Sequence, residues 1–300
     1  MPSRILIRYY GADMMKSLLK FLREPELKGL DADDPKTTEV HRRIIRRKPL
    51  LWDVYSSFYQ EFAKASELVP PGPMVELGSG GGFIKEFIPS VITSDVLNLP
   101  HVDKVLSAED TGFDDSSVSA FFLLDVFHHL KNPRGFLREA QRCLRPGGRI
   151  VMVEPANTFF GRFVRKNFHH ETHDESAAWS SNGSQVADSR ALSDANLALP
   201  WIVFVRDRNI FEREFPELSI VRYEPHTPFR FLLSGGVTYR SLVPAILLPA
   251  VKALEKLVSP FNRFLGMHVT IEIEKLDRAA SEGRISSSPS ARGQHGRGNS

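Results

Sequence analysis

Between residues 70 and 155, short apolar runs alternate with stretches in which apolar residues recur at helical spacing. The runs predict strands at residues 74–77, 91–95, 104–106, 118–124 and 149–153. Helices are predicted between some of them, at 83–88, where Pro89 ends the helix, and at 132–144, where Pro133 fits its start. Strands and helices that alternate at this spacing predict a parallel sheet covered on both faces.

Two more strand-like segments follow, at 218–223 and 267–274, with a helical stretch near 241–257 between them. We expect both segments to extend the sheet and the last one to return antiparallel to its neighbour. The predicted fold class is therefore α/β, with a seven-stranded, mostly parallel sheet, helices on both faces and an antiparallel last strand.

The segments that flank the sheet have other patterns. Residues 24–40 are polar and lack a period, which predicts a loop, whereas residues 51–62 carry a helical stripe, which predicts an amphipathic helix. The last twenty residues hold six Ser and four Gly, so they cannot bury enough surface to fold. We expect a helical segment over 1–69, one domain over 70–277 with a lid insertion at about 156–207, and a disordered tail over 278–300.

Composition and charge narrow the class of protein. The chain has 300 residues, 42% of them hydrophobic and 25% charged, which is typical of a globular protein. The net charge of +3 is uneven, because residues 1–50 carry +5, residues 51–277 carry −5 and residues 278–300 carry +3. A mildly acidic body argues against a broad basic face for nucleic acid, although a basic N-terminal arm could still contact phosphates.

Cysteine content and hydropathy point to a cytoplasmic protein. The one cysteine, Cys143, excludes an internal disulfide and a multi-thiolate zinc site. No run of about 18 apolar residues predicts a membrane-spanning helix, and the apolar run at the N-terminus is too short for a signal peptide.

The most informative segment is the glycine-rich loop after the first strand, with the spacing Glu76-x-Gly78-x-Gly80-x-Gly82. Such a loop lets backbone N–H groups approach a ligand that side chains would obstruct. A dinucleotide fingerprint is disfavoured because Phe83 stands where its third glycine belongs, and a P-loop is excluded because Lys85 is not followed by Ser or Thr. A glycine turn without a ligand is the alternative.

Asp95 ends the second predicted strand, seventeen residues after Gly78. An acidic residue at this place in nucleotide-binding α/β sheets accepts hydrogen bonds from ribose hydroxyls. The alternative for Asp95 is an ordinary turn residue at the end of a strand.

Three further segments are in register with this loop: residues 107–113, 123–130 and 144–149. Together with the glycine spacing they resemble the class I S-adenosylmethionine-dependent methyltransferases, in particular the type 11 subgroup. The resemblance implies a Rossmann-like sheet and S-adenosylmethionine as cofactor. One segment departs from the subgroup, because Ser107 replaces the usual Asp and Thr111-Gly112 replace Leu-Pro, so Glu109 or Asp110 is expected to contact the adenine instead.

The resemblance also implies which residues bind the cofactor. They come from the glycine loop, from the ends of the second and fourth strands and from the adenine-side loop: Glu76, Gly78, Ser79, Gly80, Gly82, Asp95, Val96, Ala108, Glu109 and Asp125.

The acceptor of the methyl group should lie beyond the carboxyl ends of the fourth and fifth strands, near Asp125 and Glu154. His128 and His129 are the candidate catalytic bases there, since imidazole changes protonation near neutral pH. The alternative for this pair is packing or capping at the start of a helix. His169 and His173 would share a helix face, but no third ligand is evident, so no metal site is predicted.

Three features favour a small-molecule acceptor, such as a metabolite, a sugar or a lipid-related group. No Asn-Pro-Pro-Tyr or Asp-Pro-Pro-Tyr follows the fourth strand, Cys143 lies in a predicted helix away from the acceptor side, and the body is acidic. Two alternatives stay open: methylation of a macromolecule through the basic N-terminal arm, and a non-catalytic protein that binds S-adenosylmethionine. The oligomeric state is left open.

Two stretches outside the motifs raise further hypotheses. The lid insertion carries aromatic residues that could line the acceptor site or pack in a core: Phe159, Phe160, Phe163, Trp179 and Trp201. Residues 242–251 are uncharged and, with the basic stretch 41–48, leave room for peripheral contact with an anionic membrane or a lipid-linked substrate. A buried helix and a solvated basic face are the alternative.

Overall fold

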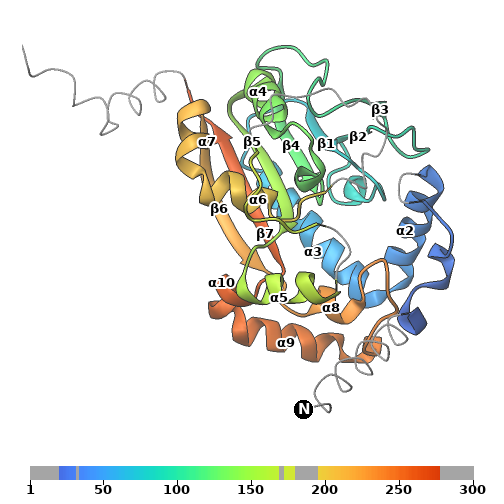
Figure 1. The fold of residues 1–300 in the computed structure, drawn as a ribbon. Coiled ribbons are helices and arrows are strands. Elements are labelled where there is room, and N and C mark those ends of the chain that lie inside the picture. Colours follow the sequence, from blue (N-terminus) through green and yellow to red (C-terminus); the bar gives the residue numbers. More distant parts are fainter. Residues whose placement is uncertain (1–19, 32–33, 169–171, 180–194, 278–300) are drawn as a thin grey trace, which may run out of the picture.

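The computed structural model describes residues 20–31, 34–168, 172–179 and 195–277. Its centre is a seven-stranded sheet in the order β3-β2-β1-β4-β5-β7-β6 (Figure 1). The strands are β1 Met74–Leu77, β2 Ile92–Asp95, β3 Lys104–Val105, β4 Val118–Leu124, β5 Leu144–Pro155, β6 Leu218–His226 and β7 His268–Lys275. β7 pairs antiparallel with both β5 and β6, and the other pairs are parallel. The predicted fold class is confirmed.

Helices cover both faces of the sheet. The α-helices are α2 Pro35–Arg47, α3 Pro49–Ser66, α4 Pro133–Cys143, α5 Phe159–Phe168, α6 Leu199–Trp201, α7 Arg208–Glu214, α8 Arg230–Ser234, α9 Leu248–Val258 and α10 Asn262–Leu265. Short 3-10 helices are η1 Pro25–Leu27, η2 Ile84–Glu86, η3 Phe127–His129, η5 Ala245–Leu247 and η6 Ser259–Phe261, and η4 Ile202–Arg206 is a short π-helix.

The buried strand β4 shows how the two faces are separated. Successive side chains of a strand point to opposite faces, so Phe121 and Leu123 join one core cluster while Ala120 and Phe122 join the other. The first cluster is completed by α4, η4 and α7, and the second by α2 and α3. Phe62 of α3 stacks on Phe122, with ring centroids 5.2 Å apart. Helix α3 is therefore fixed on the face of the sheet where Phe83 and Ile84, which follow the glycine loop, also pack.

The prediction of a loop over residues 24–40 was wrong in its second half, because α2 begins at Pro35. Asp34 caps this helix by accepting a hydrogen bond from the Lys36 N–H, and proline at the first helical position suits a helix start. The buried face of α2 begins with Thr37 and Thr38 rather than with aliphatic residues. For this reason the apolar period was weak at the start of the helix.

The crossover from β1 to β2 also differs from expectation. A helix was predicted over residues 83–88, but the structure has only the 3-10 turn η2 there. The backbone of the glycine loop is not helical, and Pro89 follows soon after, so too few residues remain for a full helix. Phe83 and Ile84 are buried against the α3 side instead.

Other element boundaries lie close to those expected, with one exception. β5 begins at Leu144 rather than at residue 149, and a register shift between Val118 and Ala120 of β4 accommodates the additional residues of β5. The tail over 278–300 lies outside the described residues, and the division into three parts remains a prediction. Among the described helices, none has the length and apolar character needed to cross a bilayer.

Candidate functional site

A cavity of about 490 Å³ opens at the carboxyl ends of β1, β2 and β4. This volume falls within the range of small-molecule sites. Eight of the ten residues predicted to bind the cofactor line it: Gly78, Ser79, Gly80, Asp95, Val96, Ala108, Glu109 and Asp125. Glu76 and Gly82 are not among the lining residues. Of the two candidate bases, His129 lines the cavity and His128 does not.

The glycine loop needs its glycines for conformation and for space. Gly78 has φ +65°, and a Cβ there would lie 2.6 Å from the side chain of Val126. Gly82 also has φ +65°, and a Cβ there would lie 2.1 Å from the His101 ring. Both positions are in the left-handed region, where a side chain adds strain. The loop can therefore keep this path only with glycine at both places.

Asp95 connects the loop to the end of β2. Its Oδ2 accepts a hydrogen bond from the Gly80 N–H at 3.0 Å, and its Oδ1 accepts one from the Leu97 N–H at 2.9 Å. The Ser79 N–H donates to the Ser94 carbonyl at 2.8 Å, which ties the same two elements together. The carboxylate is thus held in the cavity wall by backbone donors on both sides.

Residues of helix α2 contact the other side of the glycine loop. The sequence patterns did not predict these contacts. The Arg42 guanidinium donates to the Gly81 carbonyl, and the ring of His101 hydrogen-bonds the Gly80 carbonyl. The other ring nitrogen of His101 lies 3.2 Å from a carboxylate oxygen of Glu39, which is also on α2. Helix α2 therefore holds the carbonyl side of the loop, directly through Arg42 and indirectly through the contact of Glu39 with His101, while Asp95 accepts from the Gly80 N–H.

Glu76 lies buried beneath the loop. Burial raises the pKa of its carboxyl to about 8, against hydrogen bonds from Ser79 and Tyr59 that favour the charged form. Its Oε2 has no hydrogen-bond partner among the described residues. The carboxyl group is thus largely neutral at pH 7.

The remaining cavity wall comes from outside the predicted motifs. It consists of side chains of α2 and α3 together with one residue after α8: Thr38, His41, Ile45, Tyr55, Tyr59 and Val237. Burial raises the pKa of both tyrosine hydroxyls, and the nearby Asp125 carboxylate adds to the effect at Tyr55. Both hydroxyls therefore remain neutral hydrogen-bond donors.

The aromatic residues expected in a lid do not line this cavity. Phe159 and Phe163 point to solvent, and Trp179 is buried beneath the Arg134 guanidinium, which lies 4.2 Å from the ring centroid. The sequence places Tyr55 and Tyr59 in the apolar stripe of α3 but does not indicate that they line a cavity. That stripe looks the same whether it faces a core or a cavity.

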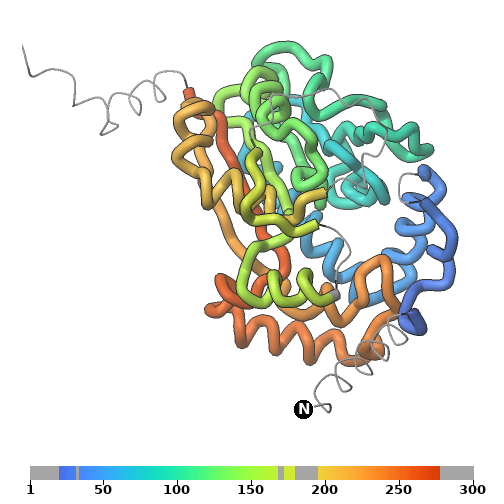
Figure 2. The backbone as a smooth tube through the Cα atoms, in the orientation of Figure 1, coloured from blue at the N-terminus to red at the C-terminus, as the bar shows by residue number. Residues whose placement is uncertain are grey.

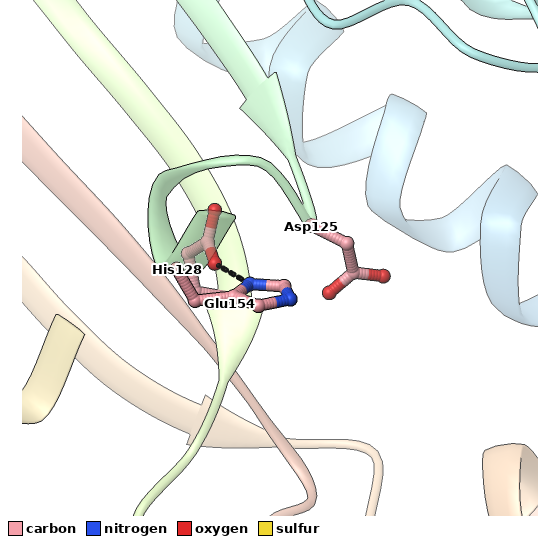
Figure 3. A group of neighbouring side chains, drawn as sticks. All are labelled: Asp125, His128 and Glu154. Carbon is pink, nitrogen blue, oxygen red and sulfur yellow. Dashed lines mark hydrogen bonds and ion pairs between the residues drawn. The ribbon is translucent and has the colours of Figure 1, made fainter. Parts of the chain in front are cut away.

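Asp125, His128 and Glu154 meet at the edge of the cavity (Figure 3). The Nδ1 of His128 lies 2.6 Å from Glu154 Oε2, and Glu154 Oε1 accepts from the N–H groups of Val126 and Phe127. The second ring nitrogen of His128 points toward the Asp125 carboxylate. Burial lowers the pKa of His128 and raises that of Glu154, so each group is shifted toward its neutral form.

The three residues offer ligand atoms within 4.8 Å of one another, a spacing that a metal ion could use. Both oxygens of Glu154 are already engaged by hydrogen bonds, however, and so is one ring nitrogen of His128. These hydrogen bonds therefore favour a hydrogen-bonded cluster of the three side chains over a metal-binding site. Of the other histidine pair, His169 lies outside the described residues. The Nε2 atom of His173 lies 3.6 Å from a carboxylate oxygen of Glu175.

Asp125 reaches the cavity from a strained backbone. Its φ is +54°, which is uncommon for a residue with a side chain. Its N–H donates to the Val153 carbonyl at 2.9 Å, so the conformation is held by the end of β5. The ring of His129 packs on that of His128 with centroids 4.2 Å apart. Asp125 and His129 are thus the polar groups that this corner presents to the cavity.

One part of the chain matches a known protein family. Residues 75–152 match the model of a family described as a methyltransferase domain. No curated protein matches the chain.

Several solved structures resemble the chain at low sequence identity. The YcgJ protein from Bacillus subtilis is 14% identical, with 74% of this chain and 99% of that chain covered and a TM-score of 0.42. An S-adenosylmethionine-dependent methyltransferase from Thermotoga maritima is also 14% identical, with 79% and 99% covered and a TM-score of 0.44. Geranyl diphosphate C-methyltransferase from Streptomyces coelicolor is 17% identical, with 85% and 89% covered and a TM-score of 0.40. At these values none of the three indicates the reaction of this chain.

The raised pKa of Glu76 predicts a measurable effect of pH on stability. The pKa rises from 4.5 to about 8 on folding, so this group stabilises the fold fully below pH 4.5, and its contribution is lost as pH rises toward 8. Between these limits we expect the free energy of unfolding of the wild type to fall relative to that of Glu76→Gln by about 2–5 kcal/mol.

Urea unfolding at a series of pH values measures this difference. Glu154 is present in both proteins, so subtracting the two curves isolates Glu76. A Glu67→Gln variant, which changes an exposed carboxylate at the end of α3, serves as the matched control and should give a flat difference. Equal pH dependence in the wild type and Glu76→Gln would contradict the neutral state of Glu76.

Proposed function

Because residues 75–152 form a class I S-adenosylmethionine-dependent methyltransferase domain of the type 11 subgroup, with S-adenosylmethionine as cofactor, we propose that this chain methylates a small molecule. The acceptor binds in the cavity between the glycine loop and helices α2 and α3. The observation that carries the proposal is that one cavity joins the cofactor-type wall of Gly78, Gly80 and Asp95 to a second wall that includes two tyrosines.

The residues of the first wall fit the cofactor. Gly78, Gly80 and Gly81 bring the loop backbone into the cavity wall, and Asp95 presents a carboxylate that can accept from ribose hydroxyls. Val96 and Ala108 supply apolar surface for a flat base. Glu76 adds a buried carboxyl with an unpartnered oxygen directly beneath the loop. When bound, the cofactor supplies an electrophilic methyl group on a sulfonium.

The second wall suits a small acceptor. Tyr55 is a neutral donor beside Ile45 and Val237, so it can orient an acceptor. Tyr59, whose hydroxyl hydrogen-bonds Glu76, contributes its ring to the wall and helps to exclude water. Asp125 and His129 are placed to receive a proton from an acceptor hydroxyl or amine. His128 acts behind them as a positioning residue, because its ring is held by Glu154.

The charges of helix α2 weaken the case for a macromolecular acceptor. Arg46 pairs with Glu86, Arg47 with Glu24 and Glu26, and Arg42 with the glycine loop. Lys48 is buried, and its Nζ donates to backbone carbonyls. Most of the basic stretch 41–48 is therefore engaged within the fold. A non-catalytic cofactor-binding protein remains the second candidate, motivated by the altered adenine-side loop.

Cofactor binding should depend on the backbone of the glycine loop. We expect Gly78→Ala to weaken binding of S-adenosylhomocysteine about tenfold or more, because the new Cβ adds strain at positive φ and meets Val126. Gly29→Ala is the matched control, since Gly29 also has positive φ but open space around it. Isothermal titration calorimetry measures both.

A second variant tests the cofactor wall at the end of β2, outside the glycine positions. Asp95→Asn preserves the shape of the side chain and removes the charge that would accept from the ribose. We expect it to weaken binding as well. Wild-type affinity in Gly78→Ala and Asp95→Asn together, or no binding by the wild type, would reject the cofactor site.

Transfer of labelled methyl groups decides between the candidate functions. With S-adenosylmethionine labelled in its methyl group and a size-fractionated cell extract, we expect label in the small-molecule fraction. His129→Ala should lower the rate of that transfer about tenfold or more while S-adenosylhomocysteine binding stays at the wild-type level. Leu68→Ala, at an exposed site on the chain after α3, is the control for both readouts.

Three other outcomes of this experiment would each change the account. Label in protein or nucleic acid would favour the macromolecular alternative. Cofactor binding without any transfer would favour the non-catalytic one. Full activity in both His129→Ala and His128→Ala would remove the histidines from the mechanism.

A further inference from the structure

One side of the molecule carries an unusually apolar exposed surface. Helix α9 buries only Val251 and Glu255 and leaves the rest of its length exposed or partly exposed. The large apolar side chains exposed along η5, α9, η6 and α10 are Ile246, Leu247, Leu254, Leu257, Phe261 and Phe264. Ile246 and Leu257 are 84% and 76% exposed. Monomeric proteins rarely expose large apolar residues in such a cluster without a binding role.

Helix α5 extends this surface. It packs against α10, and both helices lie on the same side of the molecule as α9 (Figures 1 and 2). Phe159 is 72% exposed, and Phe163 and Lys166 are also exposed one and two turns further along the helix. Residues four and seven apart share a helix face, so α5 presents two aromatic rings and a cation together. We call the exposed faces of α5, η5, α9, η6 and α10 the docking face.

The charges carried by the segments of the docking face are mostly positive. Residues 241–265 contain Lys252, Lys256 and Arg263, all exposed; Lys252 pairs with Asp53 of α3, and Lys256 and Arg263 form no ion pair with the described residues. The one carboxylate of residues 241–265, Glu255, is turned inward, where it pairs with Arg230 and accepts from the Phe229 N–H. Helix α5 contains no acidic residue. The docking face therefore combines aliphatic and aromatic side chains with a cationic rim.

This combination fits one partner best. Apolar side chains gain free energy by entering the boundary between headgroups and acyl chains, and lysine and arginine beside them are attracted to anionic headgroups. No described helix could cross the bilayer, so contact of this kind would lie in the interface. We propose that the docking face binds the surface of an anionic lipid bilayer.

The same charges disfavour a second copy of the chain as the partner. In a symmetric dimer the same face of both copies forms the interface, so Lys256 and Arg263 of both copies would lie within it. Like charges at an interface oppose association. A bilayer with anionic lipids neutralises them instead. The proposal goes beyond the methyltransferase reaction and does not depend on it.

Co-sedimentation of the full chain with vesicles tests the proposal. We expect binding to phosphatidylcholine vesicles that contain phosphatidylglycerol, weaker binding to phosphatidylcholine alone, and loss of the difference at high salt. The triple variant Ile246→Ser, Leu257→Ser, Phe261→Ser should bind the anionic vesicles about tenfold or more weakly. Leu68→Ser, which changes an exposed leucine away from the docking face, is the matched control and should bind as the wild type does.

The charges are tested separately. Lys256→Glu combined with Arg263→Glu should reduce binding to the anionic vesicles about tenfold and leave binding to the neutral ones nearly unchanged. Thermal unfolding of each variant checks that the fold is kept; these side chains are exposed, so the midpoints should stay near that of the wild type.

Two results would overturn the proposal. The first is no association of the wild type with anionic vesicles, or undiminished association of the triple variant. The second is a wild-type dimer in sedimentation velocity that the triple variant converts to a monomer, because the docking face would then be an interface between two copies of the chain.

Discussion

The backbone path of the glycine loop is the constraint from which the rest of the site follows. With Gly78 and Gly82 at positive φ, the loop directs the Gly81 carbonyl to Arg42 of α2 and the Gly80 N–H to Asp95 at the end of β2. Arg42 and His101 hold the carbonyl side, and Asp95 holds the N–H side. Helix α2 is thereby tied to the sheet at the place where the cofactor must bind, although it lies before the domain in sequence.

This arrangement explains why the N-terminal charge is a poor guide to partners. The net charge of +5 over residues 1–50 suggested an arm for an acidic macromolecule. In the fold, Arg42 donates a hydrogen bond to the Gly81 carbonyl of the glycine loop, and Arg46 lies over the Trp52 ring and pairs with Glu86. The exposed positive charge that remains beside apolar surface lies instead near α9 and α10. Val237 lines the cavity and Leu242 is exposed beside η5, so one short segment connects the two regions.

The sequence predicted the sheet well because its central strands are buried on both faces. The apolar run of β4 ends at the observed boundaries, and the glycine spacing identified most of the first cavity wall. It could not predict α2, whose buried face begins with threonines, or the role of Tyr55 and Tyr59, which depends on what α3 packs against. The helix predicted at residues 83–88 does not form, because the glycine loop takes up residues that this helix would need.

The central claim is that one cavity joins a cofactor wall, built on the glycine loop and Asp95, to an acceptor wall built on α3. A crystal structure with S-adenosylhomocysteine tests this most directly. The account predicts ligand density in the cavity, with the ribose hydroxyls on the Asp95 carboxylate and the sulfur facing the side lined by Tyr55 and His129. A ligand bound elsewhere, or bound here with its ribose away from Asp95, would contradict it.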